Sequence, residues 1–380
     1  MEHQVEGKRS TASSSSARVG IIANNVGGYS RNVIRGVASF AFARAWDCRV
    51  EGVNETNIDA AKLRQFDGLI IQAATPEQAR LVGKASVPAV NVSSALGLKR
   101  VPSVVSDDRA VGAMGAEHFL RRGHRSFAFY APDQRQFAAL RFEGFSARLA
   151  TERLTCERAA DEATILRVMA APEGPMAVMA CNDRSAVALL AVCRSAGLRV
   201  PEDVAVLGVD NDELMQSLAN PPLSTINTAR ERIGFEAAAM LERLMQGKAI
   251  DGDLVLVPPK DVITRRSTDA LAINDPDVVA AARFIQHHAG RQIGVLDVAR
   301  RATISRRQLE RRFRDALGRT IHDEILRCRV DRARSLLIES DLTLPQVAMA
   351  SGFAAASYFT TVFRRELGTT PGEFRARLRT

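Results

Sequence analysis

The sequence predicts a two-lobed α/β core followed by an all-α domain with two helix-turn-helix units. Three observations lead to this fold class. Apolar runs alternate with helical segments from residue 18 to about 265, a helical pattern is repeated near the carboxyl end, and arginine is concentrated in that same part. The chain of 380 residues is long enough for more than one domain.

The apolar runs of the first part have the character of buried parallel strands, because they are continuous rather than alternating. They are VGIIA (19–23), DGLIIQ (67–72), VPAVNV (87–92), RSFAFYA (125–131), MAVMAC (176–181) and VAVLGV (204–209). Helical segments such as AVGAMGAEHFLRRG and RSAVALLAVCRSAG lie between them. This alternation predicts parallel sheets, and the length suits two lobes.

Polar side chains follow several of these runs, at the sheet edge where ligands of α/β folds bind. The candidate ligand-binding residues are Asn25, Tyr29, Asp107, Arg141, Asn182, Asp183 and Asp210. Carboxylates and amides bond several hydroxyls, and an arginine fork holds two oxygens, so this set suits a polyhydroxylated ligand beside an apolar wall from Tyr29, Phe137 or Phe142. Helix capping is the alternative role of Asp108 and Asp183.

The segment ISRRQLERRFRDALG (304–318) predicts an amphipathic helix with a basic face. Leu309, Phe313 and Leu317 recur at i, i+4 and i+8 and form one apolar stripe. Ser305 suits the start of this helix and Gly318 suits its end. The opposite side carries arginines at 307, 311 and 314. A solvated face is the alternative interpretation, although ordinary solvated faces mix charges of both signs.

A second copy of this pattern, AAASYFTTVFRRELG (354–368), favours a nucleic-acid partner. Phe359, Phe363 and Leu367 repeat the apolar stripe, and each copy follows a short helical segment with a Val-Ala pair and a tight turn. The pattern therefore predicts two helix-turn-helix units, whose second helices enter the major groove. The candidate DNA-contacting residues are Arg306, Arg307, Glu310, Arg311, Arg314, Ala356, Ser357, Thr360, Thr361 and Arg364.

The residues expected on the outward face of the second helix differ between the two copies. The first copy has mostly arginines there, whereas the second has Ala356, Ser357, Thr360 and Thr361. Hydrogen-bonded base readout should therefore be concentrated in the first unit, with methyl contacts and shape fit in the second. Residues 276–380 contain 19 arginines, no lysine and 11 acidic residues, a net charge of +8 out of +9 for the whole chain. This asymmetry indicates a polyanionic partner.

Residues 278–380 resemble an AraC-type DNA-binding domain, above all in SYFTTVFRRELGTTPGEFR. The resemblance implies two helix-turn-helix units joined by a central helix around VDRARSLLI (330–338). It also implies recognition helices in successive major grooves, about 34 Å apart.

The segment RVPEDVAVLGVDNDELMQSLANPPLSTINT (199–228) resembles the effector-binding core of the lactose/galactose-repressor family, as do ACNDRSAVALLAVCRSAGL before it and VITRRST after it. That core is similar to periplasmic sugar-binding proteins, with two lobes and three crossovers. The resemblance assigns sugar contacts to Arg141, Asn182 and Asp210. The expected boundaries are 1–17 for a disordered tail, 18–267 for the core, 268–276 for a linker and 277–380 for the DNA-binding domain.

The combination over residues 18–380 resembles regulators of the xylose-operon type. It implies a sugar-responsive regulator, an activator by family analogy, whose partners are double-stranded DNA and a xylose-like monosaccharide. A homodimer, contact with RNA polymerase and a cytoplasmic location are further expectations. The residues alone leave pentose, hexose and sugar acid open.

Two other classes of function, a transport or sensing component and an enzyme, are less consistent with these residues. A sugar-binding component of a transport or sensing system is the alternative, against which the basic domain and the lack of a signal peptide count. No membrane span is expected. An enzyme, a cofactor or a metal site is not expected either, because the sequence lacks catalytic-triad, phosphate-loop and metal-ligand spacings. Five scattered cysteines fit a reducing compartment.

Overall fold

The computed structural model describes residues 16–23, 28–52, 60–84, 86–96, 98, 101–171, 174–250, 252–270, 273 and 275–379. Most of the expected tail, 1–17, and the candidate Asn25 lie outside these residues. The chain divides into two compact units. The first comprises Met1–Phe119 and Arg125–Ala270, and the second comprises Leu120–His124 and Leu271–Thr380.

The first unit contains two six-stranded sheets, one in each lobe. The sheet of the first lobe has the order β11 (Leu254–Val257), β5 (Ser103–Ser106), β4 (Ala89–Asn91), β3 (Gly68–Ile71), β1 (Arg18–Ala23), β2 (Asp47–Gly52). The sheet of the second lobe has the order β12 (Val262–Ile263), β10 (Ser224–Ile226), β9 (Val204–Val209), β8 (Met176–Ala180), β6 (Ser126–Tyr130), β7 (Glu157–Ala159). The pairing of β10 with β12 is antiparallel, and the other pairings among the described strands are parallel.

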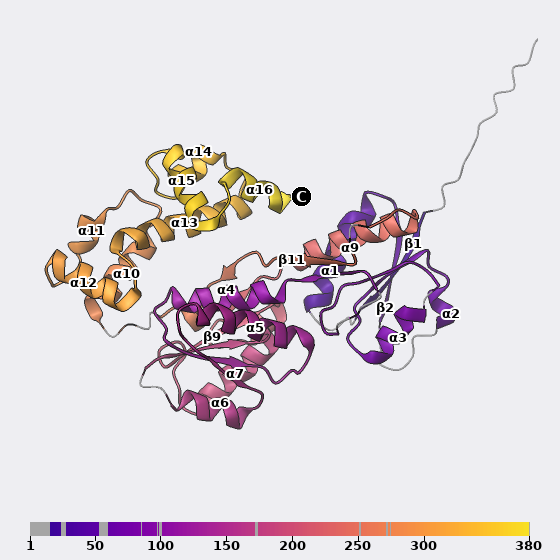
Figure 1. Ribbon diagram of the computed structural model, residues 1–380, viewed down its shortest axis with the longest axis horizontal. Helices are drawn as coiled ribbons and strands as arrows, with labels where there is room; N and C mark the ends of the chain where they lie inside the picture. The colour runs from indigo at the N-terminus through magenta and orange to yellow at the C-terminus, as the bar shows by residue number, and fades with distance from the viewer. Residues whose placement is uncertain are drawn as a thin grey trace, which may run out of the picture. The chain divides into compact units, whose positions relative to one another are not determined.

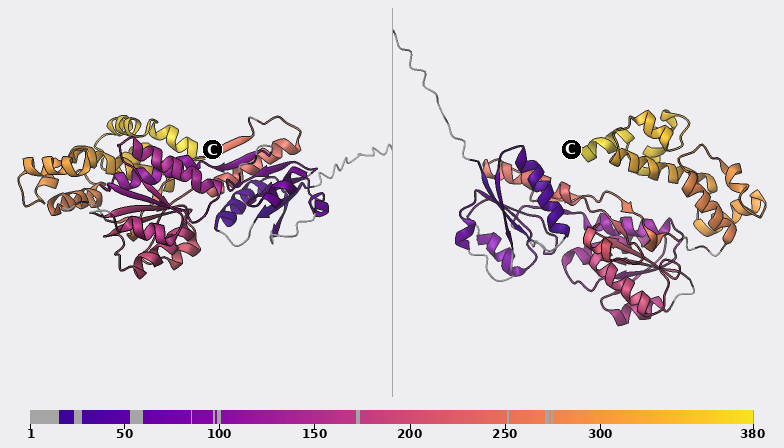
Figure 2. Two further views of the ribbon diagram at one scale, coloured as in Figure 1. Left: turned by 60° about the horizontal axis from the view of Figure 1, so that its bottom comes forward. Right: turned by 180° about the vertical axis from the view of Figure 1, so that it is seen from behind.

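Helices cover the faces of both sheets (Figures 1 and 2). The first lobe carries α1 (Gly28–Phe42), α2 (Ala60–Leu63), α3 (Pro76–Lys84) and α9 (Arg230–Met245). The second lobe carries α4 (Asp108–Leu120), α5 (Gln136–Ala150), α6 (Glu162–Met169), α7 (Asp183–Ser195), α8 (Glu213–Leu218) and the 3-10 turn η1 (Arg266–Thr268). The apolar runs of the sequence thus form buried strands, which confirms the predicted α/β class.

The chain passes between the lobes three times. The passages run from β5 to β6 through α4, from β10 to β11 through α9, and from β11 to β12. Since polar residues after parallel strands lie at one sheet edge, these crossovers bring the strand ends of both lobes to a common region.

The second unit is helical, as the sequence predicts. Its helices are α10 (Pro276–His288), α11 (Val295–Ala299), α12 (Arg306–Leu317), α13 (Ile321–Glu339), α14 (Leu344–Ala350), α15 (Ala356–Leu367) and α16 (Pro371–Arg379). The central helix α13 is longer than the expected segment 330–338, because it serves two hydrophobic cores. Ile321, Ile325 and Cys328 face the core of α10–α12, whereas Leu326 and Val330 belong to a second stripe that faces α14–α16.

Candidate effector site and nucleic-acid interface

Five charged side chains form one group in the first unit, which we call the effector cluster. Its members are Asp108, Arg141, Asp183, Asp210 and Arg230. Asp108 and Asp183 are the first residues of α4 and α7, and Asp210 directly follows β9. The strand ends therefore converge as the sequence predicts, although Arg230 was not among the residues expected at the site.

Arg141 is fixed against α4 by unusually close helix packing. A Cβ at Gly112 of α4 would come within 1.9 Å of the Arg141 carbonyl oxygen, and one at Gly144 of α5 within 2.0 Å of the Arg109 carbonyl oxygen. Only glycine fits at such contacts. This packing holds the Arg141 side chain beside the start of α4.

The buried pair of Asp108 and Arg141 has several hydrogen bonds. Arg141 Nε donates to Asp108 Oδ1 at 2.8 Å, and Arg141 Nη1 donates to the Cys181 carbonyl at 2.6 Å. Ser94 Oγ donates to the other Asp108 oxygen at 2.6 Å. Burial raises the pKa of Asp108, and the Arg141 charge opposes that rise.

Asp183 is also buried and accepts three hydrogen bonds. The donors are Thr225 Oγ1 at 2.6 Å, the Asp212 backbone N–H at 2.8 Å and Gln216 Nε2 at 3.4 Å. Burial and the nearby Asp210 carboxylate raise the pKa of Asp183 to about 7. Two of these bonds connect Asp183, at the start of α7, to the segment that follows β9, and they hold that segment in place.

Asp210 lies on a strained turn. Its φ is 118° and that of Asn211 is 49°, both in the region that L-residues rarely adopt. Such backbone strain is concentrated at binding and catalytic sites. The turn directs the Asp210 carboxylate toward two guanidinium groups, with Arg141 Nη1 at 3.7 Å and Arg230 Nη2 in direct contact.

The other predicted ligand-binding residues have identifiable structural contacts. Tyr29 is packed at the cluster, its hydroxyl donates to the Val92 carbonyl, and burial raises its pKa. Asn182 caps α7 by accepting from the Ser185 N–H at 2.8 Å, and Asp107 accepts from the Ala110 N–H at 3.0 Å. Capping thus occupies one oxygen of each of these two side chains.

The two proposed wall residues besides Tyr29 lie in different surroundings. The Phe137 ring faces the Arg141 guanidinium, whose central carbon is 4.9 Å from the ring centroid. Phe142 packs on Phe129, with ring centroids 5.6 Å apart. Phe137 therefore adjoins the effector cluster, whereas Phe142 packs with an aromatic residue of β6.

Arg230 could have been found from one signal in the sequence. It opens α9, four residues after the buried strand β10. Most of the predicted site residues follow four other strands, β1, β5, β8 and β9. A charged residue at a helix start after a buried strand occupies the same sheet edge as the others.

The effector cluster can bind a polyol. Asp210 and the guanidinium groups supply acceptors and donors for hydroxyls, and two aromatic rings, of Tyr29 and Phe137, lie beside them. A metal role is not indicated, because the described residues contain no group of three or more His, Cys, Asp or Glu side chains placed to hold an ion.

The second unit contains the two predicted helix-turn-helix pairs, α11–α12 and α14–α15. Phe313 of α12 and Phe363 of α15 are fully buried at equivalent positions. Both recognition helices end at a left-handed glycine, Gly318 with φ 70° and Gly368 with φ 71°. The repeat in the sequence is thus a repeat in structure.

Recognition helix α12 exposes a row of arginines. Arg307, Arg311 and Arg314 are exposed, and no ion pair engages them within the part of the chain that the structure describes. Arg306 forms an exposed pair with Glu310 at 2.8 Å. Ser305 caps the helix through a reciprocal bond with Gln308. The row is therefore available to phosphate or base edges.

Recognition helix α15 presents hydroxyls and methyl groups instead. Thr360 and Thr361 each donate their hydroxyl to a backbone carbonyl one turn earlier, at 3.0 and 3.1 Å. Ala356, Ser357 and Arg364 are exposed. The N-cap residue Ala355 makes no side-chain cap bond, as its sequence predicts.

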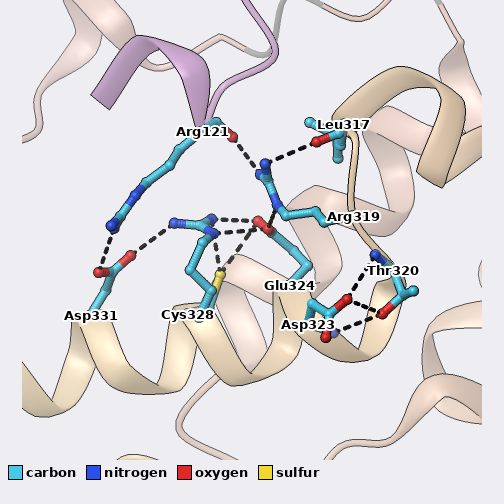
Figure 3. Close-up of polar contacts among 9 residues, drawn as sticks. Arg121, Leu317, Arg319, Thr320, Asp323, Glu324, Cys328 and Asp331 are labelled. Carbon is cyan, nitrogen blue, oxygen red and sulfur yellow. Dashed lines mark hydrogen bonds and ion pairs between the residues drawn. The ribbon is translucent and has the colours of Figure 1, made fainter. Parts of the chain in front are cut away.

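A second group of buried charges, which we call the α13 cluster, lies inside the second unit (Figure 3). Its members are Arg121, Arg319, Glu324, Arg327 and Asp331. Glu324 accepts from Arg319 Nε at 2.5 Å and from Arg327 Nε at 2.8 Å. Burial acts to raise the pKa of Glu324, but Arg327 and Arg319 lower it to about 2.

Arg121 connects the short segment Leu120–His124 to α13. Its Nη1 donates to Asp331 at 2.9 Å, and its carbonyl accepts from Arg319 Nη2 at 2.6 Å (Figure 3). This segment directly follows α4 in the chain. Arg319 and Arg327 of the basic domain are thus used internally, so its number of arginines overstates the number available to DNA.

None of the helices within the described ranges is both long and apolar enough to cross a membrane. The five cysteines all lie within those ranges and are free thiols.

Comparison with known proteins defines the class. A periplasmic binding protein-like domain matches residues 116–268, and a helix-turn-helix domain matches residues 298–377. The fold and the exposed arginine row therefore define a DNA-binding transcription regulator with a core of the sugar-binding type.

Individual relatives cover almost the whole chain. The xylose operon regulatory protein of Escherichia coli (strain K12) is 30% identical over 94% of this chain and 96% of its own length. That of Haemophilus influenzae is 28% identical over 91% of this chain and 95% of its own. The solved structure of the xylose-binding transcription activator xylR matches with a TM-score of 0.61 and 27% identity, over 96% of this chain and 99% of that one.

The chain belongs to the family of the xylose operon regulatory proteins. It is a sugar-responsive DNA-binding transcription regulator rather than an enzyme, as the sequence predicts. The alternative of a transport component is not favoured.

Proposed function

We propose that this regulator binds xylose or a closely related monosaccharide at the effector cluster and then changes its contact with operator DNA. The observation that carries this proposal is the group of Arg141, Asp210 and Asp183 at the strand ends of the core. Xylose is named because relatives that match nearly the whole chain are regulators of the xylose operon.

The arginine row of α12 supplies the main base contacts in this proposal. Arg307 and Arg311 reach base edges or phosphates of the major groove, and α15 adds methyl contacts and shape fit. The exposure of both arginines supports this assignment. The two helices read one asymmetric half-site, so a homodimer reads two.

Activation of transcription, contact with RNA polymerase and a cytoplasmic location complete the proposal. Activation is supported by the solved relative, which is a transcription activator. The cytoplasm is supported by the free thiols, because disulfides are rare in reducing compartments.

Helix α4 is our proposed route from sugar to DNA. It begins at Asp108 of the effector cluster and ends at Leu120, and the next residue, Arg121, bonds to α13. A sugar that shifts the start of α4 then acts on the helix that joins the two cores of the DNA-binding domain. The sugar can change this equilibrium only by binding the two forms with different affinity.

A thermal-shift screen over pentoses, hexoses and sugar acids tests the binding part of this proposal. We expect stabilisation by D-xylose or a close relative, and DNA footprinting with that sugar should show altered affinity or protection. If no monosaccharide stabilised the protein, the proposed effector class would be wrong.

The variant Arg121→Met tests the route. We expect the variant to bind the sugar as tightly as the wild type does. The change in operator affinity that the sugar causes should be at least about tenfold smaller than in the wild type. Arg125→Met is the matched control, because Arg125 is exposed and lies four residues away. A full sugar response in Arg121→Met would exclude this route and leave the regulatory function intact.

A further inference from the structure

Arg230 is a buried guanidinium at the site with no assigned role. Its side chain is almost fully buried, with 3% of the residue exposed. It follows Ala229, whose φ of 54° is a left-handed conformation that alanine rarely adopts. Close packing of α9 on α1 fixes the position of the helix, because a Cβ at Gly36 would come within 1.8 Å of the Glu231 carbonyl oxygen.

The contacts of Arg230 leave most of its donors unused. Its Nε donates to Thr228 Oγ1 at 3.1 Å, and its guanidinium lies over the Tyr29 ring, 4.9 Å from the centroid. It contacts the Asp210 carboxylate as an ion pair. Even so, Nη1 is buried and has no hydrogen-bond partner among the described residues.

Unsatisfied buried donors require an explanation, because buried polar groups are normally hydrogen-bonded. A guanidinium carries five N–H donors; here Nε bonds to Thr228 and Nη2 contacts Asp210, which leaves Nη1 without an acceptor. The neighbours of Arg230 are Asp210 of the effector cluster and the ring of Tyr29 beside it. An oxygen of the effector is the acceptor that this position lacks.

The charges around Arg230 indicate the kind of oxygen. Two buried arginines, Arg141 and Arg230, face the carboxylates of Asp108 and Asp210, with Asp183 close by. The cluster therefore has no excess of positive charge. A carboxylate or phosphate brought into it would remain uncompensated and buried, which is costly, whereas a hydroxyl or ring oxygen would not.

We propose that Arg230 is a further effector-binding residue, which donates from Nη1 to a hydroxyl or ring oxygen of an uncharged monosaccharide. It thereby contributes to affinity, and the carboxylates of Asp108 and Asp210, which already neutralise the two arginines, disfavour the corresponding sugar acid. This inference rests on the proposed function, because it assumes that the effector cluster binds a sugar.

The variant Arg230→Met removes the donors and keeps the length of the side chain. We expect the Kd of the full-length protein for D-xylose to rise about 10- to 100-fold, because hydrogen bonds to charged groups are lost. Arg230→Lys keeps the charge opposite Asp210 but lacks the fork, so its Kd should lie between those of the wild type and Arg230→Met.

Arg232→Met is the matched control on the same helix, where Arg232 pairs with Glu236 at 3.5 Å. It should leave the Kd for D-xylose unchanged. Thermal unfolding without sugar shows whether Arg230→Met folds. If it does not, the Kd of Arg230→Lys for D-xylose tests the inference instead.

D-xylonate, the acid of the same sugar, tests the discrimination. We expect no stabilisation of the wild type by D-xylonate at concentrations where D-xylose stabilises it. Unchanged D-xylose affinity in both Arg230 variants, or tighter binding of D-xylonate than of D-xylose, would overturn the inference and leave the sugar response in place. If neither neutral nor acidic sugars bound the wild type, the proposed function itself would fail, and the inference with it.

Discussion

The effector cluster and the α13 cluster are both built from buried arginines and carboxylates, but they differ in how completely their polar atoms are hydrogen-bonded. Glu324 of the α13 cluster accepts from two arginines, and their charges lower its pKa to about 2. In the effector cluster, the buried Nη1 of Arg230 has no hydrogen-bond partner in the described residues, and the pKa of Asp183 is raised to about 7.

This difference indicates what each cluster does. A fully hydrogen-bonded group of buried charges holds one arrangement of the chain, whereas an incomplete group is stabilised by a ligand that supplies the missing partners. We therefore assign a structural role to the α13 cluster and a binding role to the effector cluster. The predictions below test that division.

The largest effect is expected for Glu324→Ala. Removal of the carboxylate leaves Arg319 and Arg327 without their buried partner. Breaking a buried pair in this way costs about 3–5 kcal/mol. Calorimetric unfolding should show this loss, and Glu310→Ala, at an exposed pair on α12, should cost less than about 1 kcal/mol. A small effect of Glu324→Ala would contradict the structural role.

The pH dependence of stability should differ in sign between the clusters. The pKa of Glu324 is depressed to about 2, so its contribution is present above its ordinary pKa of 4.5 and is lost as the pH falls through 2. The pKa of Asp183 is raised to about 7. Its contribution is complete below its ordinary pKa of 3.8 and is lost as the pH rises through 7.

Asp183→Asn isolates the second of these effects. The amide cannot ionise, so the variant should gain stability relative to the wild type as the pH is raised from 5 to 8, by about 1–3 kcal/mol. Thermal unfolding at both pH values measures this difference. If the difference in stability between Asp183→Asn and the wild type were the same at pH 5 and at pH 8, Asp183 would not titrate in this range.

A third group of charges, the exposed arginines of α12, extends the comparison to unpaired surface charge. Arg311→Ala should weaken operator binding by about 1–3 kcal/mol with little change in stability. The control is Arg312→Ala, because Arg312 lies next to it and pairs with Asp275 at 3.2 Å. Equal losses on operator and random DNA would assign Arg311 to a phosphate contact rather than a base.

Much of this arrangement could be predicted from local sequence. Continuous apolar runs predicted the buried strands. Leu309 and Phe313 of the first copy correspond to Phe359 and Phe363 of the second, and this repeat predicted the two helix-turn-helix units. Asp183 and Asp210 could be expected at one site, because residues that follow parallel strands lie at one sheet edge.

The rest depends on contacts between distant residues. The place of Arg230 after a buried strand is visible in the sequence, but close packing of α1 on α9 is what brings its guanidinium over Tyr29. Arg121 and Asp331 are 210 residues apart in the chain, so no local pattern could predict their ion pair. The sequence also did not predict which contact the Asn182 side chain makes; in the structure its oxygen accepts from the Ser185 N–H and caps α7.

Operator binding by the wild type and by Asp210→Ala, with and without D-xylose, tests the central claim most directly. The account predicts that the sugar changes the affinity or footprint of the wild type, and that Asp210→Ala loses this change and the sugar-induced thermal stabilisation while its sugar-free DNA affinity is unaltered. Retention of both sugar effects in Asp210→Ala would contradict it.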